Sequence, residues 1–183
     1  MVEESRLLGT QLTSDLRWSR NTDEMVSKAM KKMWLLRRLK ILKLDRNTIL
    51  EYYIKEIRPL VEQCVPVWNS GLTGSHNKEI EKVQKVACRI ILGSNYVNYQ
   101  IACNSLGIFP LSDRRHQLSL NYAIKLFHSP RRDEFFSVTQ NNVNTRRPKL
   151  VVEQKSRTKR CYNAPHNYLS RLINQNIDKI IKK

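Results

Sequence analysis

Apolar residues recur every three or four positions through most of the first 130 residues, which is the spacing of helices with one buried face. The first such run begins at Thr22 or Asp23, either of which can act as an N-cap. A second run begins at Asp45, and Pro59 should end or bend it within a turn. The expected buried residues are Val26, Ala29, Met30, Met33, Leu36 and Leu39 in the first helix and Ile49, Leu50, Tyr53, Ile54 and Ile57 in the second.

Three further helices are predicted between residues 75 and 128. Ser75 can cap the third, Gly93 should stop it, and a short fourth helix should run from residue 98 to 106 before Gly107. The fifth should begin near Pro110 and end near His128. Its inward residues should be His116, Leu120, Ala123, Ile124 and Phe127, and those of the third helix Ile80, Val83, Ala87, Ile90 and Ile91. Five helices with short loops predict an all-α fold, an irregular bundle.

The two ends of the chain have other patterns. Residues 6–13 look like short strands, whereas residues 131–183 carry 13 Lys and Arg against 4 Asp and Glu. Such a basic, polar segment favours a flexible, partly disordered tail. A weak apolar repeat from Tyr168 to Ile173 predicts one late helix within it. We therefore expect an N-terminal segment at 1–20, a helical domain at 21–130 and a tail at 131–183.

The net charge of +17 and the pI near 10 point to a polyanionic partner. Nucleic acid ranks ahead of an anionic membrane or an acidic protein. We expect no membrane span and no signal peptide, since no apolar run has the required length, and therefore an intracellular protein of the cytoplasm or nucleus. The spacing of the four cysteines fits neither a zinc site nor a disulfide framework, which predicts reduced thiols.

The sequence lacks the residue patterns of the common catalytic sites. It has no Asp-Asp dipeptide for a two-metal polymerase site, and none of its four histidines begins a His-x-Asp or His-x-Glu iron motif. Its five glycines are isolated and form no phosphate loop. We therefore expect no enzymatic activity, no cofactor, no metal and no small-molecule substrate.

Basic residues along the first helix are the candidate binding site, because Lys and Arg hold phosphates without reading bases. A solvated helix face is the alternative interpretation. Core or edge packing is expected for each of the three tryptophans, in preference to stacking on bases. The candidate nucleic-acid-binding residues on this helix and its exit are Lys28, Lys31, Lys32, Arg37, Arg38, Lys40 and Lys43. A second, looser set consists of Arg131, Arg132, Arg146, Arg147 and residues 155–160.

Several motifs, taken in order, resemble the C-terminal thumb and connection segment of non-LTR (LINE or jockey-like) retrotransposon reverse transcriptases. They are LGTQL followed by LRW, a basic helix, the proline motif IRPLVEQCVPVW, the helix IEKVQKVACRIILG, the turn LGIFPL and an arginine-rich helix with Arg114 and Arg115, and they span roughly residues 7–137. The resemblance adds Arg114 and Arg115 to the candidate nucleic-acid-binding residues. The resemblance implies that residues 1–20 are a remnant of the palm edge. It also implies a segment that contacts the backbone of an RNA or RNA–DNA template–primer, beside a palm domain that carries the catalytic carboxylates.

Two alternatives remain open at this point. The chain could be a helical protein-interaction scaffold whose apolar surfaces are completed by a palm domain that this sequence lacks. The same region also resembles stretches labelled as the N-terminal domain of alkylated-DNA-repair AlkB homologues, which implies an oxoglutarate-dependent dioxygenase or a methyltransferase. The residues present here provide neither the iron ligands nor the cofactor loop of such enzymes.

Overall fold

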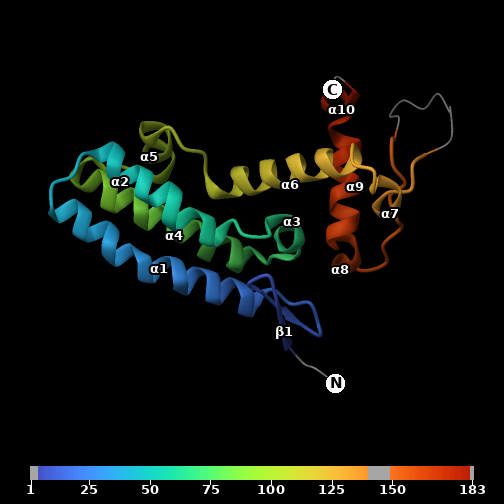
Figure 1. Cartoon of the computed structure of the whole chain (residues 1–183), viewed down its shortest axis with the longest axis horizontal. Coiled ribbons are helices and arrows are strands. Elements are labelled where there is room, and N and C mark those ends of the chain that lie inside the picture. Colours follow the sequence, from blue (N-terminus) through green and yellow to red (C-terminus); the bar gives the residue numbers. More distant parts are fainter. Residues whose placement is uncertain (1–3, 140–148, 182–183) are drawn as a thin grey trace. The chain divides into compact units, whose positions relative to one another are not determined.

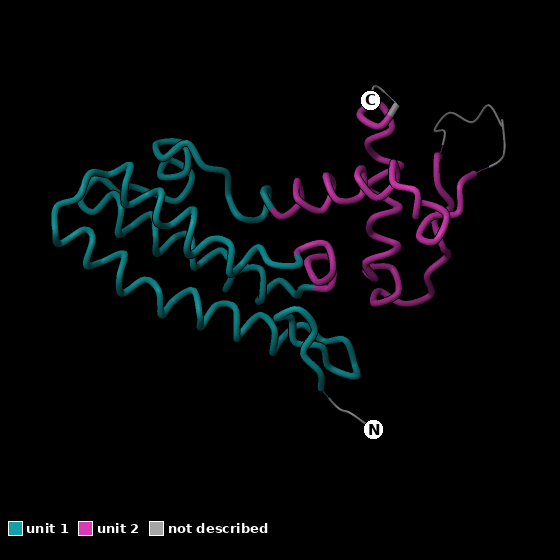
Figure 2. Tube along the Cα trace, viewed as in Figure 1, with its two compact units in different colours: residues 1–64, 72–114 teal, residues 65–71, 115–183 magenta. Residues whose placement is uncertain are grey.

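The computed structural model describes residues 4–139 and 149–181, and it is mostly helical (69%), with an N-terminal two-stranded hairpin (Figure 1). About seven of the helices are substantial. The sequence predicts six, namely five in the helical domain and one late helix in the tail. The chain forms two compact units, residues 1–64 with 72–114 and residues 65–71 with 115–183 (Figure 2). Among the described residues, no helix combines the length and apolar character needed to cross a bilayer.

The N-terminal hairpin pairs β1 (Glu4–Leu7) with β2 (Thr10–Thr13) in antiparallel register. Its two-residue turn has positive φ at Leu8 (48°) and Gly9 (82°), the geometry that matches the twist of hairpin strands. An added Cβ at Gly9 would lie 2.7 Å from Nε2 of Gln63, so that side chain would have to move. That Nε2 donates to the Leu8 carbonyl oxygen at 2.6 Å, so the first unit holds a hairpin that would be marginal alone.

Helices α1 (Ser19–Ile41) and α4 (Gly74–Leu92) form the main helix pair of the first unit. Ala29, Met33 and Leu36 are fully buried, as the periodicity of the sequence predicts. The predicted start of α1 is wrong: the helix begins at Ser19, and Thr22 lies inside it with its side chain buried. For α4, Thr73 is the N-cap and accepts from the backbone N–H of His76, so the predicted Ser75 cap is also wrong.

Pro59 alters the second helical run as expected. Helix α2 (Arg46–Tyr52) continues into a π-helical turn, η1 (Tyr53–Ile57), and then a 3-10 turn, η2 (Arg58–Val61). A proline has no N–H to donate and its ring crowds the carbonyl four residues back, so a regular α-helix cannot pass through it. The rest of this stretch forms α3 (Val65–Trp68) and η3 (Asn69–Gly71).

Two helices complete the predicted series. After η4 (Gly93–Asn95), helix α5 (Tyr99–Leu106) begins at an Asn98 N-cap and ends at Gly107 with φ 65°, as predicted. Helix α6 (Leu111–Phe127) also lies where the sequence places it, and Leu120 and Ala123 are buried. The inward position predicted for His116 is wrong, because Arg115 is buried in its stead and His116 is exposed. The buried face of α6 thus runs from Leu111 through Arg115 to Leu120 and Ala123, and it passes through Arg115 where periodicity suggested the next residue.

The second unit has a core of its own, built largely by the tail. The described tail contains α7 (Arg132–Phe135), α8 (Lys159–Tyr162), α9 (Pro165–Gln175) and α10 (Ile177–Ile181), where one late helix was expected. Asn174 fixes the segment that we expected to be flexible: its Oδ1 accepts from the N–H of Val151 at 3.2 Å and its Nδ2 donates to the Val151 carbonyl at 2.9 Å. The core consists of Leu120, Ala123, Phe136, Val151, Leu169, Leu172, Ile173 and Ile180. Residues 140–148, also part of that expectation, lie outside the described residues.

Candidate functional site

Positive charge is concentrated along α1 and the residues that follow its C-terminal end. Between Met25 and Leu44 there are seven Lys and Arg residues and no acidic residue. Helical geometry places the apolar stripe of Ala29, Met33 and Leu36 inward, so the basic residues lie at the sides and on the solvent face. The α1 candidates from the sequence therefore share one helix and its exit.

Three of these seven cations have partners within the first unit. Lys28 pairs with Glu24 at 2.5 Å, and Lys32 pairs with Glu56 at 2.8 Å. The hydrogen bond to Glu56 raises the pKa of Lys32. Lys40 Nζ donates to the carbonyl oxygen of Ile91 at 2.7 Å, at the C-terminal end of α4. Lys32 and Lys40 thus fasten α1 to its surroundings, whereas the Lys28 pair lies within α1. The carboxylates of Glu24 and Glu56 partly neutralise the charges of Lys28 and Lys32.

The other four cations are Lys31, Arg37, Arg38 and Lys43, which we call the α1 cation set. All four are exposed, and none forms an ion pair with an acidic residue in the described part of the chain. Lys43 follows the end of α1 with φ 57°, and its backbone N–H donates to the Lys40 carbonyl at 3.1 Å. Arg37 and Arg38 are adjacent, whereas Lys31 lies six residues before Arg37 and Lys43 five residues after Arg38. The set therefore extends along the second half of α1 and past its C-terminal end.

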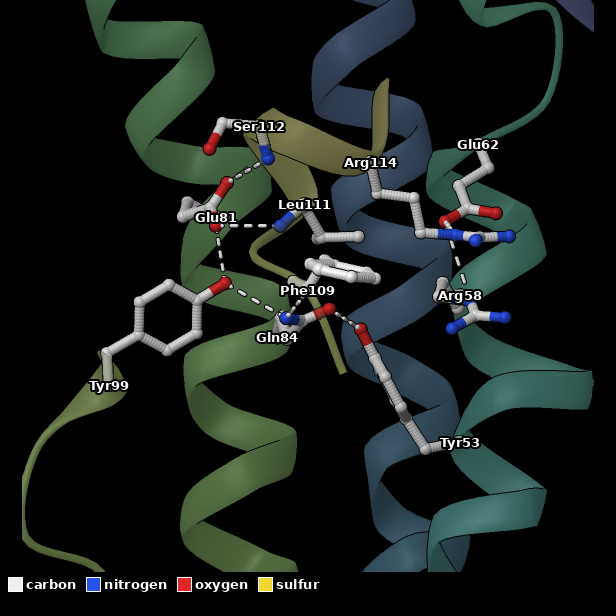
Figure 3. Close-up of polar contacts among 10 residues, drawn as sticks. All are labelled: Tyr53, Arg58, Glu62, Glu81, Gln84, Tyr99, Phe109, Leu111, Ser112 and Arg114. Carbon is white, nitrogen blue, oxygen red and sulfur yellow. Dashed lines mark hydrogen bonds and ion pairs between the residues drawn. The ribbon is translucent and has the colours of Figure 1, made fainter. Parts of the chain in front are cut away.

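Arg114 and Arg115 have different surroundings from the α1 candidates. Arg114 contacts Glu62, which also pairs with Arg58 at 3.4 Å (Figure 3). Burial lowers the pKa of Arg58, an effect that the Glu62 carboxylate opposes. Arg115 is only 1% exposed, so its guanidinium does not reach the surface. We therefore leave Arg115 out of the proposed interface and regard Arg114 as part of an internal ion-pair cluster.

A second polar cluster lies inside the first unit and connects α4 to its neighbours (Figure 3). Gln84 is fully buried; its Oε1 accepts from the Tyr53 hydroxyl at 2.8 Å. Its Nε2 donates to the Tyr99 hydroxyl at 3.0 Å and to the Phe109 carbonyl at 2.9 Å. Burial raises the pKa of Tyr53 well above its ordinary value. Tyr53, like Gln84, is fully buried, so their hydrogen bond joins η1 to α4 inside the first unit.

The carboxylate of Glu81 completes this cluster by capping α6. It accepts a hydrogen bond from the Tyr99 hydroxyl. The backbone N–H groups of Leu111 and Ser112 also donate to it, at 2.9 and 3.1 Å. Burial raises the pKa of Tyr99, and the hydrogen bond to the Glu81 carboxylate raises it further. Glu81 thus satisfies backbone donors at the start of α6, where a helix has no internal partners for them.

Groups that could bind a metal are dispersed in the structure. Within residues 4–139 and 149–181, no three His, Cys, Asp or Glu residues gather as a metal site would require. Cys88 and Cys103 are buried, Cys64 is half-buried and Cys161 is exposed, and all four are free thiols. Burial raises the pKa of Cys88 to about 12, which disfavours its thiolate.

One surface residue was missed by sequence reasoning. Trp18 and Trp68 are buried as expected, but Trp34 is 60% exposed, so the packing predicted for it is wrong. Trp34 lies on the side of α1 opposite the stripe that ends at Leu36, and Arg38 lies over its ring with 5.5 Å from the guanidinium carbon to the ring centroid. The signal was present in the sequence: Trp34 has cations at positions i−3, i+3 and i+4.

No protein-family model matches the chain, and neither a curated protein nor a solved structure matches it either.

Proposed function

We propose that this chain is a non-catalytic, helical nucleic-acid-binding segment derived from a non-LTR retrotransposon reverse transcriptase. Its α1 cation set would contact the sugar-phosphate backbone of an RNA or RNA–DNA template–primer. The observation that carries the proposal is the stretch from Met25 to Leu44, with seven cations, no acid, and four cations that lack an acidic partner among the described residues. Cations that are exposed and unpaired can release counterions from phosphates at little internal cost.

The remaining structure fits a rigid support for such a surface. The helix that carries the cations is attached by Lys32 to Glu56 and by Lys40 to the end of α4. Neither contact uses a member of the α1 cation set. Binding of an anion would therefore leave the internal ion pairs intact, and the protein could bind phosphates without a change of fold.

A charge-matched pair of variants tests this proposal. The first variant replaces Lys31, Arg37, Arg38 and Lys43 by Gln. The second replaces four exposed cations outside both candidate sets, Lys55, Lys78, Lys82 and Lys125, by Gln. Both lose four positive charges. Fluorescence anisotropy with a labelled RNA–DNA duplex should show at least about a tenfold weaker affinity for the first variant. The second variant should bind nearly as well as the wild type. Equal losses in the two variants, or no binding by the wild type at low salt, would refute the proposal.

A second candidate function is a helical scaffold that docks onto a palm domain. It is favoured by exposed apolar side chains at the end of α1, where Ile41 and Leu42 are 68% and 71% exposed. Such side chains in one region often mark a protein interface. Light scattering with and without a separately supplied palm domain tests it: a shift to a stoichiometric complex supports docking, and an unchanged monomer contradicts it.

A further inference from the structure

We infer that α1 binds single-stranded nucleic acid, with an unpaired base stacked on Trp34 and the neighbouring phosphates held by Lys31, Arg37 and Arg38. This inference rests on the proposed function and deepens it, because it specifies an unpaired strand and assigns a base contact. Phosphate binding alone needs only cations. An exposed aromatic ring within a cationic helix surface adds a platform for a base.

The surroundings of Trp34 carry the inference. A helix brings residues three and four apart next to each other, so Lys31, Arg37 and Arg38 all border the indole. The indole is 60% exposed and Arg38 lies 5.5 Å from its centroid. Tryptophan is usually among the more buried side chains, so this exposure is unusual for a residue that packs. Base–aromatic stacking and phosphate contacts within one turn are what an unpaired strand requires, since its bases and phosphates alternate along the chain.

Charge favours nucleic acid over two other partners for this surface. A second copy of the chain would bring the α1 cation set against itself, and the chain as a whole carries +17. An anionic membrane would require an apolar helix face beside the indole, yet three of the four positions one turn from Trp34 are Lys31, Arg37 and Arg38. A nucleic acid avoids both costs, because its base can stack on the ring face that Arg38 leaves free while its phosphates meet the cations.

A pair of oligonucleotides separates base stacking from phosphate binding. One is a labelled single-stranded 12-mer of thymidines, and the other is an abasic 12-mer with the same phosphates. The wild type should bind the thymidine strand more tightly than the abasic strand by about tenfold. Trp34→Ala should remove that preference, and Trp34→Phe should retain part of it. Ile41→Ala, an exposed apolar residue on the same helix, is the matched control and should leave the preference unchanged.

Tryptophan fluorescence gives a second readout that does not depend on affinity. Trp18 and Trp68 are buried, so quenching by a stacked base should come from Trp34. The thymidine strand should quench the wild type, whereas the abasic strand should not, and Trp34→Phe should lose the quenching.

The outcomes distinguish this inference from the proposed function. Equal affinity for both strands, unchanged by Trp34→Ala, would overturn the stacking inference and leave phosphate binding in place. No binding to either strand or to a duplex would overturn both. A Trp34-dependent blue shift with anionic phosphatidylserine vesicles and no quenching by the thymidine strand would assign the surface to a membrane. A dimer that Trp34→Ala dissociates, with no strand preference, would assign it to a second copy.

Discussion

Replacing Gln84 by leucine should destabilise the first unit strongly, although the two side chains are similar in volume. Leucine cannot accept from the Tyr53 hydroxyl, which lies in a fully buried side chain and has Gln84 Oε1 as its partner at 2.8 Å. A buried polar group left without a partner costs about 1–3 kcal/mol. The bonds from Nε2 to Tyr99 and Phe109 are lost as well. Together these losses should lower the free energy of unfolding by about 2–4 kcal/mol.

The assay is urea unfolding followed by far-ultraviolet circular dichroism. Gln117→Leu is the matched control, because it makes the same substitution at an exposed position of α6 and removes only a surface hydrogen bond to Asn121. It should change the free energy of unfolding by less than about 0.5 kcal/mol. Adding Tyr53→Phe to Gln84→Leu removes the orphaned hydroxyl. The double variant should therefore lose less than the sum of the two single losses, by about 1–2 kcal/mol. Strict additivity, or a Gln84→Leu effect no larger than the control, would refute this reasoning.

Three further predictions concern capping, thiol reactivity and pH. Glu81→Gln replaces one acceptor oxygen at the start of α6 by a donor, so hydrogen exchange at the Leu111 and Ser112 amides should quicken by about tenfold. The Ile101 amide, which donates to the Asn98 side chain, is the control and should be unaffected. Equal protection of Leu111 and Ser112 in both proteins would contradict this prediction. Iodoacetamide at pH 8 should label exposed Cys161 in the native protein, but Cys88, buried and with its pKa raised to about 12, should be labelled only after unfolding, which mass spectrometry can show. A hydrogen bond from Lys28 lowers the pKa of Glu24, and one from Asn174 lowers the pKa of Glu153. A carboxyl group whose pKa is lower in the folded state stabilises the fold, and this stabilisation is lost as the pH falls through that pKa. The urea midpoint should thus drop as the pH falls below the ordinary glutamate value of 4.5, less so in Glu153→Gln, and a flat midpoint would argue against these bonds.

Periodicity predicted the helices that pack by a simple apolar stripe. The centres of the buried faces of α1 and α4 follow from spacing alone, as do the glycine that ends α5 and the break at Pro59. The predicted members Val26, Met30, Leu39 and Ile90 are only half-buried. These features depend on local physics, namely one buried face, one φ angle or one missing N–H. They can therefore be derived from neighbouring residues.

Features that depend on distant partners could not be derived in this way. Arg115 is buried and His116 exposed because tertiary packing sets the rotation of α6. Glu81 caps α6 from a helix 30 residues earlier, and no local pattern announces such a cap. The tail has few apolar residues, but Val151 and the late helices place them in one core. The overall composition of the tail does not show which of its few apolar residues meet, and it therefore predicted a flexible segment.

The candidate site was predicted in part. The sequence identified the seven cations of α1 and its exit, and the structure divides them into three with internal partners and the four of the α1 cation set. The partner of Lys28 is local, but those of Lys32 and Lys40 are Glu56 and the end of α4, which lie far away in the sequence. The exposure of Trp34 depends likewise on which side of α1 the rest of the unit covers.

The salt dependence of binding tests the central claim most directly. The slope of log affinity against log salt concentration should be measured with a single-stranded oligonucleotide for the wild type and for the variant that lacks the α1 cation set. Each phosphate contact contributes about 0.7 to this slope on a single strand, so the variant's slope should be shallower by about 3. A wild-type slope near zero, or the same slope in both proteins, would contradict the claim that α1 holds a nucleic-acid backbone.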